Sequence, residues 1–370
     1  MGRCVNCLLP DRVPGAEIDA RGVCACCRNL PRTDAAADEQ ARRQREADLE
    51  RALKDCRGRG EYDCMVTLSG GKDSCYLLHR IKRDYGLNVL AFTVNVNIPD
   101  VAWGNIHRTV TQLDVPHVVF TPPTGWYNRL FRFLLQNQES RGAVRTVCYV
   151  CAPLTEGYAL RCAVEKGIPL ILAGYSPGQP DRDRMFYEYR RDLICATDWT
   201  PPELRDSGEF DDAELSLFWN PFRYPAGTEL PRFLAPFHAW EYSQEETMKL
   251  VVELGLVANR RHASPIHSNC ALNWLLMYSD LKNLGYNPYA PEFSSLIRQG
   301  KANRWYWRAM APLVDFMIRR QIFLGRNVAR SLKRLNLCPA DLRIVRDAVP
   351  AACDAPLTEQ VEEVLEKATR

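Results

Sequence analysis

The sequence lacks the features of a secreted or membrane-spanning chain. It has no signal peptide, and it has no uncharged apolar run of about 18 residues, the length that crosses a bilayer. The net charge is only +3, which by itself does not indicate a nucleic acid partner. Hydrophobic residues make up 46% and charged residues 25%, as in globular proteins. We therefore expect a cytoplasmic protein without membrane contact, built from one large or two moderate domains.

Cysteine, in contrast, is abundant, with 15 among 370 residues. Without a secretion signal a disulfide framework is not expected, so metal or sulfur chemistry explains the cysteines better. Two Cys-x-x-Cys knuckles near the start of the chain are spaced as in a structural zinc ribbon, in which four thiolates enclose Zn²⁺. We predict this ribbon over residues 1–33, with Cys26 spare and with the ligands Cys4, Cys7, Cys24 and Cys27.

The loop at residues 68–74 is the most informative motif. Its sequence, Leu-Ser-Gly-Gly-Lys-Asp-Ser, separates a predicted strand at 64–68 from a predicted helix at 74–81. A glycine turn at the start of a helix gathers unpaired N–H groups where the helix dipole is positive, which suits a phosphate group. The loop lacks the four-residue spacer of a Walker A motif. Asp73 is expected to hold Mg²⁺ or to face away, and phosphate contacts are expected from Ser69, Gly70, Gly71, Lys72 and Ser74.

After the loop, predicted strands at 88–94, 117–120 and 169–175 alternate with predicted helices. This alternation predicts an α/β fold with a parallel, doubly wound sheet and a ligand site at the carboxyl ends of its strands. We expect the nucleotide near Thr93, at the end of the second strand, and near Gly174, at the end of the strand 169–175.

The Ser-Gly-Gly-x-Asp-Ser pattern of the loop resembles the PP-loop ATP pyrophosphatase superfamily. The resemblance implies that the chain binds ATP, that a substrate oxygen attacks the α-phosphorus, and that pyrophosphate leaves. It also implies catalytic roles for Lys72 and Asp73. The adenylated oxygen would then be displaced by sulfur or by nitrogen.

A further Cys-x-x-Cys, Cys148 and Cys151, is expected at the start of a helix that runs to about residue 166. Thiols at a helix N-terminus have lowered pKa values, so a redox pair, metal ligands and a nucleophile are all open interpretations. The position of the pair resembles the tRNA 2-thiouridine and 2-thiocytidine synthetases, in which a third cysteine completes the ligation of a 4Fe-4S cluster that carries the sulfur. This resemblance implies a cluster held by Cys148, Cys151 and Cys270.

The N-terminal pattern is also similar to the N-acetyl sugar amidotransferases, which use ammonia from a partner glutaminase. Both resemblances cover about residues 1–175. Because Cys270 supplies a third ligand, we favour a sulfurtransferase that receives sulfur from a donor and acts on a small-molecule or carrier-bound substrate. The amidotransferase is the alternative, and a tRNA thiolation enzyme is a second one. A nucleic acid substrate is not favoured, because Cys338 and Cys353 stand alone and form no second ribbon.

The remaining segments complete the predicted domain organisation. Residues 34–60 are charged and alanine-rich, which predicts a linker helix. We expect an ATP-binding domain at 61–242, with a proline- and arginine-rich insertion at 176–242, and a mainly helical region at 243–370. Basic and aromatic residues interleave at 301–308, a pattern compatible with RNA binding but also with an ordinary helix. The oligomeric state is left open, a homodimer included.

Overall fold

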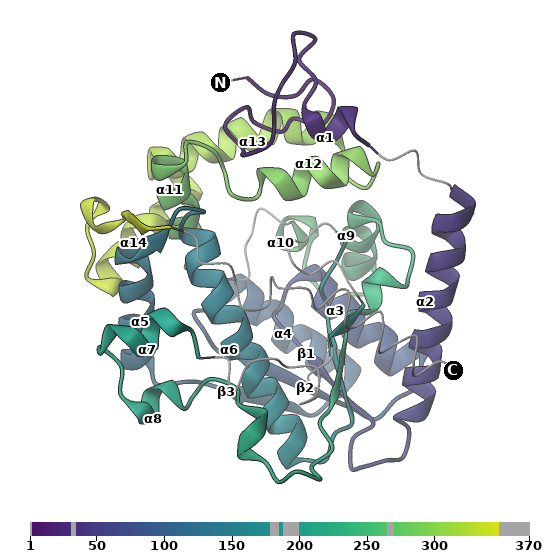
Figure 1. Ribbon diagram of the computed structural model, residues 1–370. Helices are drawn as coiled ribbons and strands as arrows, with labels where there is room; N and C mark the ends of the chain where they lie inside the picture. Colours follow the sequence, from purple (N-terminus) through teal and green to yellow (C-terminus); the bar gives the residue numbers. More distant parts are fainter. Residues whose placement is uncertain (1, 31–34, 178–184, 188–199, 265–269, 348–370) are drawn as a thin grey trace.

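A parallel sheet forms the centre of the computed structural model, which describes residues 2–30, 35–177, 185–187, 200–264 and 270–347 (Figure 1). In this part of the chain the strand order is β3-β2-β1-β5-β7-β6. The parallel strands are β1 (Cys64–Thr67), β2 (Val89–Val94), β3 (His117–Phe120), β5 (Leu170–Ala173) and β7 (Arg232–Leu234). The edge strand β6 (Phe186–Tyr187) is antiparallel to β7. The predicted doubly wound parallel sheet is therefore confirmed.

The order of the strands reverses beside β1. From β1 the chain builds outward through β2 to β3, and it then returns to place β5 on the other side of β1. In sheets of this kind such a reversal leaves a crevice at the carboxyl ends of the two central strands. The loop 68–74 follows β1, and Gly174 follows β5, so both lie at this point.

Helices cover both faces of the sheet. Alternate strand residues point to opposite faces, so that Met65 packs in one apolar cluster while Cys64 and Val66 pack in another. The Met65 cluster contains side chains from α5 (Thr124–Gln136) and α6 (Ala143–Glu165). The other cluster contains side chains from α2 (Ala35–Asp55), α3 (Lys72–His79), α4 (Asp100–Leu113) and α9 (Gln244–Glu253). A π-helical turn, η1 (Arg80–Asp84), continues α3.

The C-terminal region is mainly helical, as predicted, and it packs beside the sheet domain. Besides α9, its α-helices in the described residues are α10 (Arg260–Ala263), α11 (Asn273–Asn283), α12 (Ala290–Arg298), α13 (Arg304–Arg319) and α14 (Arg326–Leu335). Helix α11 packs against α6, and β8 (Ile344–Arg346) pairs with β4 (Gln138–Glu139). The N-terminal cysteine module with α1 (Ala25–Arg28) lies over α12 and α13 (Figure 1). The short remaining elements are α7 (Pro202–Ser207), α8 (Asp212–Leu215), η2 (Pro221–Arg223), η3 (Pro236–His238), η4 (Phe323–Gly325) and η5 (Pro339–Asp341).

Two segments differ from the sequence-based expectation. The segment 176–242, expected as an insertion, contributes β6 and β7 to the central sheet; its residues 178–184 and 188–199 lie outside the described part, as does Cys353. Helix α6 begins at Ala143, well before Cys148. The backbone N–H groups of Ala143 and Val144 donate to the carboxylate of Asp280 on α11, so this helix is capped from a distant segment. None of the described helices has the length and apolar character needed to span a bilayer.

Candidate active site

The loop after β1 is shaped by close backbone contacts that only glycine permits. Gly70 has a φ of +76°, and a Cβ atom there would collide with the carbonyl oxygen of Ala102. At Gly174 a Cβ atom would lie 2.9 Å from the backbone nitrogen of Ser74. Gly71 is extended and precedes the first residue of α3, Lys72. The carboxyl end of β5 therefore touches the start of α3, and the predicted glycine-rich turn is brought together with Gly174.

Hydroxyl groups hold the loop closed. The Ser69 backbone N–H donates to Ser74 Oγ at 3.2 Å, and Ser74 Oγ donates to the carbonyl of Gly71 at 3.1 Å. Thr93 is buried, and its hydroxyl donates to the carbonyl of Leu68 at 2.6 Å and lies 2.8 Å from His117 Nε2. The Thr93 hydroxyl is thus already engaged, and it supports the loop from within the sheet.

Lys72, Asp73 and Tyr242 form a hydrogen-bonded triad at the start of α3. Lys72 Nζ donates to Asp73 Oδ2 at 2.6 Å and to the Tyr242 hydroxyl at 3.2 Å, and the Tyr242 hydroxyl donates to Asp73 Oδ1 at 3.0 Å. The Lys72 and Asp73 side chains are only 8% and 15% exposed. Burial lowers the pKa of Lys72, but the charge of Asp73 and the hydrogen bonds to Asp73 and Tyr242 outweigh it, so the pKa is raised overall and the ammonium stays charged. Sequence analysis missed Tyr242, because nothing near it in the chain marks it.

A second carboxyl group approaches this triad from the C-terminal region. Glu292 lies in the first turn of α12, and its electrostatic interactions are with Lys72 and Asp73. Burial raises the pKa of Glu292 to about 7, while Lys72 opposes the rise and Asp73 adds to it. Glu292 therefore exchanges a proton near neutral pH beside the loop. No sequence pattern connects it to residues 68–74, and it was also missed.

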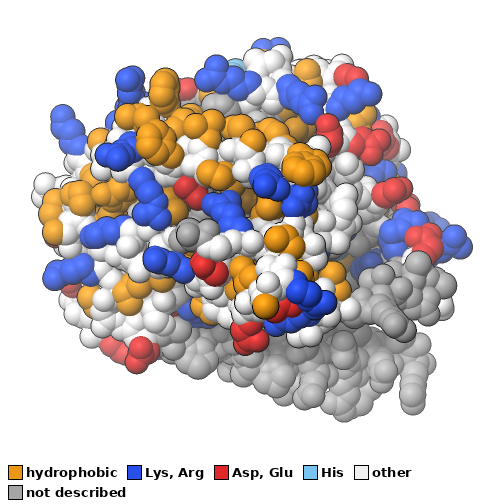
Figure 2. All heavy atoms as spheres, turned by 90° about the horizontal axis from the view of Figure 1, so that it is seen from above, with side chains coloured by type: hydrophobic (Ala, Val, Ile, Leu, Met, Phe, Trp, Pro, Cys, Tyr) orange, Lys and Arg blue, Asp and Glu red, His pale blue; other side chains and the backbone are white. Residues whose placement is uncertain are grey.

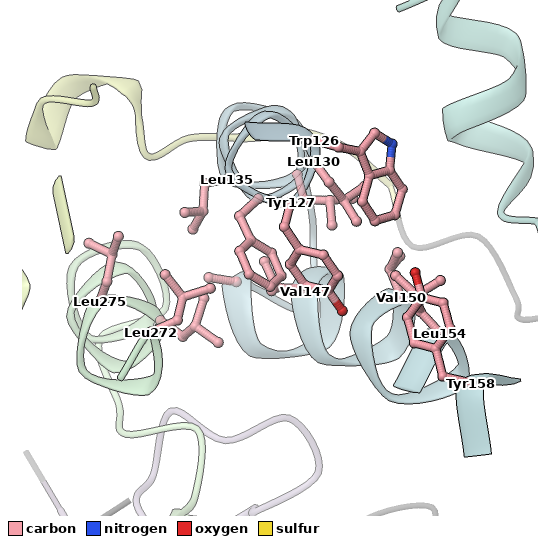
Figure 3. Packing of buried hydrophobic residues seen from close by; sticks show 14 of the residues in the cluster. Trp126, Tyr127, Leu130, Leu135, Val147, Val150, Leu154, Tyr158, Leu272 and Leu275 are labelled. Atoms are coloured by element: carbon pink, nitrogen blue, oxygen red, sulfur yellow. The ribbon is translucent and has the colours of Figure 1, made fainter. Parts of the chain in front are cut away.

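The three cysteines expected to bind a cluster gather in one place. Cys148 and Cys151 lie on α6, Cys270 lies just before α11, and all three are partly buried against the same apolar cluster. Electrostatic interactions link Cys270 with Cys148 and with Cys151, and the Tyr127 hydroxyl lies 3.7 Å from Cys151 Sγ. These cysteines pack against an apolar cluster. Figure 3 shows side chains of this cluster on or beside α5, α6 and α11: Trp126, Tyr127, Leu130, Leu135, Val147, Val150, Leu154, Tyr158, Leu272 and Leu275.

The expectation of lowered thiol pKa values is wrong for this pair. Burial raises the pKa of Cys148 well above its ordinary value, and burial raises the pKa of Cys151 to about 12. Because α6 begins at Ala143, neither thiol lies in the first turn, where the helix dipole would stabilise a thiolate. Without a bound metal these thiols are neutral, which argues against a reactive redox pair.

The four N-terminal cysteines form a much tighter group. The sulfur atoms of Cys4, Cys7, Cys24 and Cys27 all lie within 4.8 Å of one another. Cys26 is exposed and does not belong to this group. The Arg298 guanidinium of α12 donates to Cys7 Sγ at 3.3 Å. The N-terminal module therefore contacts the helical region through one of its four clustered cysteines. Four converging sulfurs suit a single tetrahedral ion such as Zn²⁺.

In the described residues, no other group of cysteine, histidine or acidic side chains is close enough to enclose a single ion. In this part of the chain, the sulfur atoms of Cys148, Cys151 and Cys270 do not converge as the four N-terminal sulfurs do. A 4Fe-4S cluster binds each thiolate to a different iron, which requires wider spacing. A cluster at these three cysteines stays a prediction.

The basic and aromatic stretch at 301–308 has mixed roles. Trp307 is buried and stacks on Phe293 with ring centroids 3.7 Å apart, whereas Trp305 is 69% exposed. The Arg304 guanidinium donates to the carbonyl of Val5, so this stretch also holds the cysteine module in place. Figure 2 shows apolar side chains and Lys or Arg side chains interspersed over the face seen from above. The RNA interpretation of this stretch stays a prediction.

Neither a protein-family model nor a curated protein sequence matches the chain. Similar solved structures include NMN synthetase from Francisella tularensis, with 10% identity and a TM-score of 0.34 over 84% of this chain and 98% of that one. U34-tRNA thiolase NcsA from Methanococcus maripaludis, solved with its [4Fe-4S] cluster, has 13% identity and a TM-score of 0.34 over 95% and 93%. NH3-dependent NAD synthetase from Campylobacter jejuni has 14% identity and a TM-score of 0.34 over 80% and 96%. Likeness at this level does not say what this chain acts on.

Proposed function

We propose that the protein is an ATP-dependent sulfurtransferase, which adenylates an oxygen of its acceptor and replaces that oxygen with sulfur. The observation that carries the proposal is that Cys270, which is distant in the sequence, packs against the same apolar cluster as the neighbouring pair Cys148 and Cys151. A glycine loop shaped for phosphate stands at the switch point of the same sheet domain. We propose a small-molecule or carrier-bound acceptor.

In the first step, backbone N–H groups at the start of α3 and the Lys72 ammonium would bind the phosphates of ATP. Asp73 would exchange its ion pair with Lys72 for a contact with Mg²⁺. The acceptor oxygen attacks the α-phosphorus, the bond from that phosphorus to the bridging oxygen breaks, and pyrophosphate leaves. Lys72 stabilises the negative charge that builds up on the phosphate oxygens. We propose Glu292, which interacts electrostatically with Lys72 and Asp73, as the group that accepts a proton released from the acceptor.

In the second step, a sulfur nucleophile attacks the activated carbon, and AMP leaves with the original acceptor oxygen. A 4Fe-4S cluster held by three cysteines has one iron without a protein ligand, and when bound it supplies a place to hold sulfide. Cys148 and Cys151 pack against an apolar cluster, which would limit the access of water to the adenylate there. The sulfur donor would be hydrosulfide, whose sulfur already has the oxidation state that it has in the product.

For the N-terminal module we propose structural zinc, bound by Cys4, Cys7, Cys24 and Cys27. All four ligand positions are filled by sulfur, so no open position is left for a reacting group. The contact of Arg298 with Cys7 supports a role in holding α12, the helix that carries Glu292.

One observation favours an alternative, the N-acetyl sugar amidotransferase. The N-terminal cysteine pattern has the order of residues that this family carries. In that case ammonia from a partner glutaminase attacks the same adenylate, and the three buried thiols are structural. The two hypotheses share the first step and differ in the nucleophile.

Metal analysis after anaerobic purification separates the two hypotheses. The sulfurtransferase predicts a brown protein with about four iron atoms and about one zinc ion per chain. Cys270→Ala should lose the iron and keep the zinc. Cys162→Ala, which changes another partly buried cysteine of α6, is the matched control and should keep both. A colourless protein that contains zinc alone would overturn the proposal in favour of the amidotransferase.

A further inference from the structure

The guanidinium of Arg334 has two buried N–H groups without a partner among the described residues. Arg334 lies in the last turn of α14, and its Nη1 group donates to Oδ1 of Asn97. Its Nε and Nη2 atoms are buried and make no hydrogen bond to any described residue. These two atoms form one edge of the planar guanidinium, the edge that binds two oxygens of a carboxylate or phosphate at once. Unpaired buried donors are costly, so this edge indicates a missing ligand.

The position of this edge is fixed by the backbone on both sides. Asn97 follows β2 in a left-handed conformation with a φ of +57°, which asparagine tolerates. The Asn97 carbonyl accepts the N–H of Ala271 at 2.9 Å, and Ser331 of α14 donates to the Ala271 carbonyl at 3.4 Å. Arg334 is therefore held between the end of β2 and the segment that begins with Cys270.

The charge of Arg334 also requires an explanation. In the described part of the chain no carboxylate forms an ion pair with it, whereas Arg3 and Arg346 are paired with Asp315 and Glu203. Burial lowers the pKa of Arg334, and the one opposing interaction comes from Cys270. Arg334 is partly buried, but its buried Nε and Nη2 donors face no carboxylate of the described residues, so the ligand expected there is an anion.

We propose that Arg334 forms an oxyanion subsite, which binds a carboxylate or phosphate group of the acceptor beside Cys270. Two parallel N–H groups match an anion with two oxygens better than they match a single sulfur, so the charge of the cysteines alone does not explain the geometry. The assignment of this anion to the acceptor rests on the proposed function, because it requires the acceptor to reach the cysteine site. It restricts the acceptor to anionic compounds.

The subsite can be tested with inorganic phosphate and with acetate, titrated into the full-length protein. The loop is first saturated with a non-hydrolysable ATP analogue, and sodium chloride at equal ionic strength corrects for salt effects. We expect one further anion to bind to the wild type, and Arg334→Gln to weaken this binding by roughly tenfold to a hundredfold. Arg334→Lys, which keeps the charge but loses the two-donor edge, should bind with intermediate affinity.

Arg330→Gln is the matched control, because Arg330 is an exposed arginine one turn earlier on the same helix. It should bind both anions like the wild type. Binding of the ATP analogue checks that each variant is folded. If Arg334→Gln does not bind the analogue, the anion affinity of Arg334→Lys is compared with that of the wild type instead. Equal anion affinity in the wild type and the Arg334 variants overturns the subsite. An Arg334 variant that keeps its anion affinity but loses iron would also overturn the subsite, because Arg334 would then stabilise the metal site at the cysteines.

Failure of the proposed function and failure of the subsite give different results in the iron analysis and the anion titration. A wild-type protein without iron that still binds phosphate through Arg334 contradicts the sulfurtransferase and leaves the subsite standing. A protein with iron but without Arg334-dependent anion binding contradicts the subsite alone.

Discussion

The ammonium of Lys72 lies 2.6 Å from the carboxylate of Asp73, its neighbour in the chain. The carboxylate and the ammonium neutralise each other, which accounts for an acidic residue in this glycine loop. In the proposed function, phosphate and Mg²⁺ would separate the two groups. Tyr242 bonds to both groups and holds them in this state. The pair therefore holds one positive and one negative charge in a site that is largely shielded from solvent.

Replacing either member of this pair should impair the ATP step. Lys72→Met should lower the rate of pyrophosphate release by about a hundredfold or more, because the charge that stabilises the phosphate oxygens is lost. Asp73→Asn should instead weaken the response to Mg²⁺. Pyrophosphate release measured against Mg²⁺ concentration separates the effects. Tyr242→Phe, which removes one hydroxyl, is expected to have the mildest effect, and a Tyr242→Phe defect as large as that of Lys72→Met would argue against this assignment.

Glu292 should make the stability of the protein depend on pH. Its pKa is raised from 4.5 in the reference state to about 7 in the folded protein. The folded state therefore binds this proton more tightly, so the contribution of Glu292 to stability is lost as the pH rises from about 4.5 through about 7. Glu292→Gln should flatten this part of the curve of unfolding free energy against pH. If the unfolding free energy of Glu292→Gln changed with pH between these values as steeply as that of the wild type, this would contradict the burial of Glu292 near the loop.

Asp280 should be needed to hold both cysteines of α6. It is fully buried, and it accepts N–H groups from Ala143 and from Val144, the latter at 3.1 Å. Asp280→Ala should cost about 1–2 kcal/mol of unfolding free energy, as the loss of a helix cap does. Because α6 carries Cys148 and Cys151, the variant should also retain less iron. Denaturant unfolding and iron analysis of the same preparation test both effects. An Asp280→Ala variant as stable as the wild type would contradict the prediction.

The N-terminal module should depend on its metal. Cys24→Ser removes one of four sulfurs and should release the zinc and lower the melting temperature of the protein. Cys26→Ser is the matched control, since Cys26 is an exposed neighbour outside the group, and it should keep about one zinc per chain. Zinc analysis and thermal unfolding of the two variants provide the measurement. Loss of zinc from both would point to a different ligand set.

The sequence predicted those parts of the site that are local in the chain. The loop 68–74 is recognisable because a short apolar strand, two glycines and a helix follow one another directly. The parallel sheet followed from the alternation of strands and helices. The four sulfurs of the N-terminal module converge as their spacing indicated.

The parts that were missed depend on contacts between distant segments. Tyr242 reaches Lys72 from the segment after β7, and Glu292 approaches from the C-terminal helices. The start of α6 was misplaced because its cap, Asp280, comes from α11. That error also produced the wrong pKa prediction for Cys148. Arg334 has no local pattern that distinguishes it from the exposed arginines of the same helix.

The most direct test of the sulfurtransferase is the electron paramagnetic resonance spectrum of the reduced protein, recorded anaerobically before and after addition of sodium sulfide. If Cys148, Cys151 and Cys270 hold a 4Fe-4S cluster with one iron open to an outside ligand, the protein shows a cluster signal and sulfide changes it. The Cys270→Ala variant should show neither signal nor change. A wild-type protein that shows no cluster signal, or whose cluster signal does not respond to sulfide, would contradict the account.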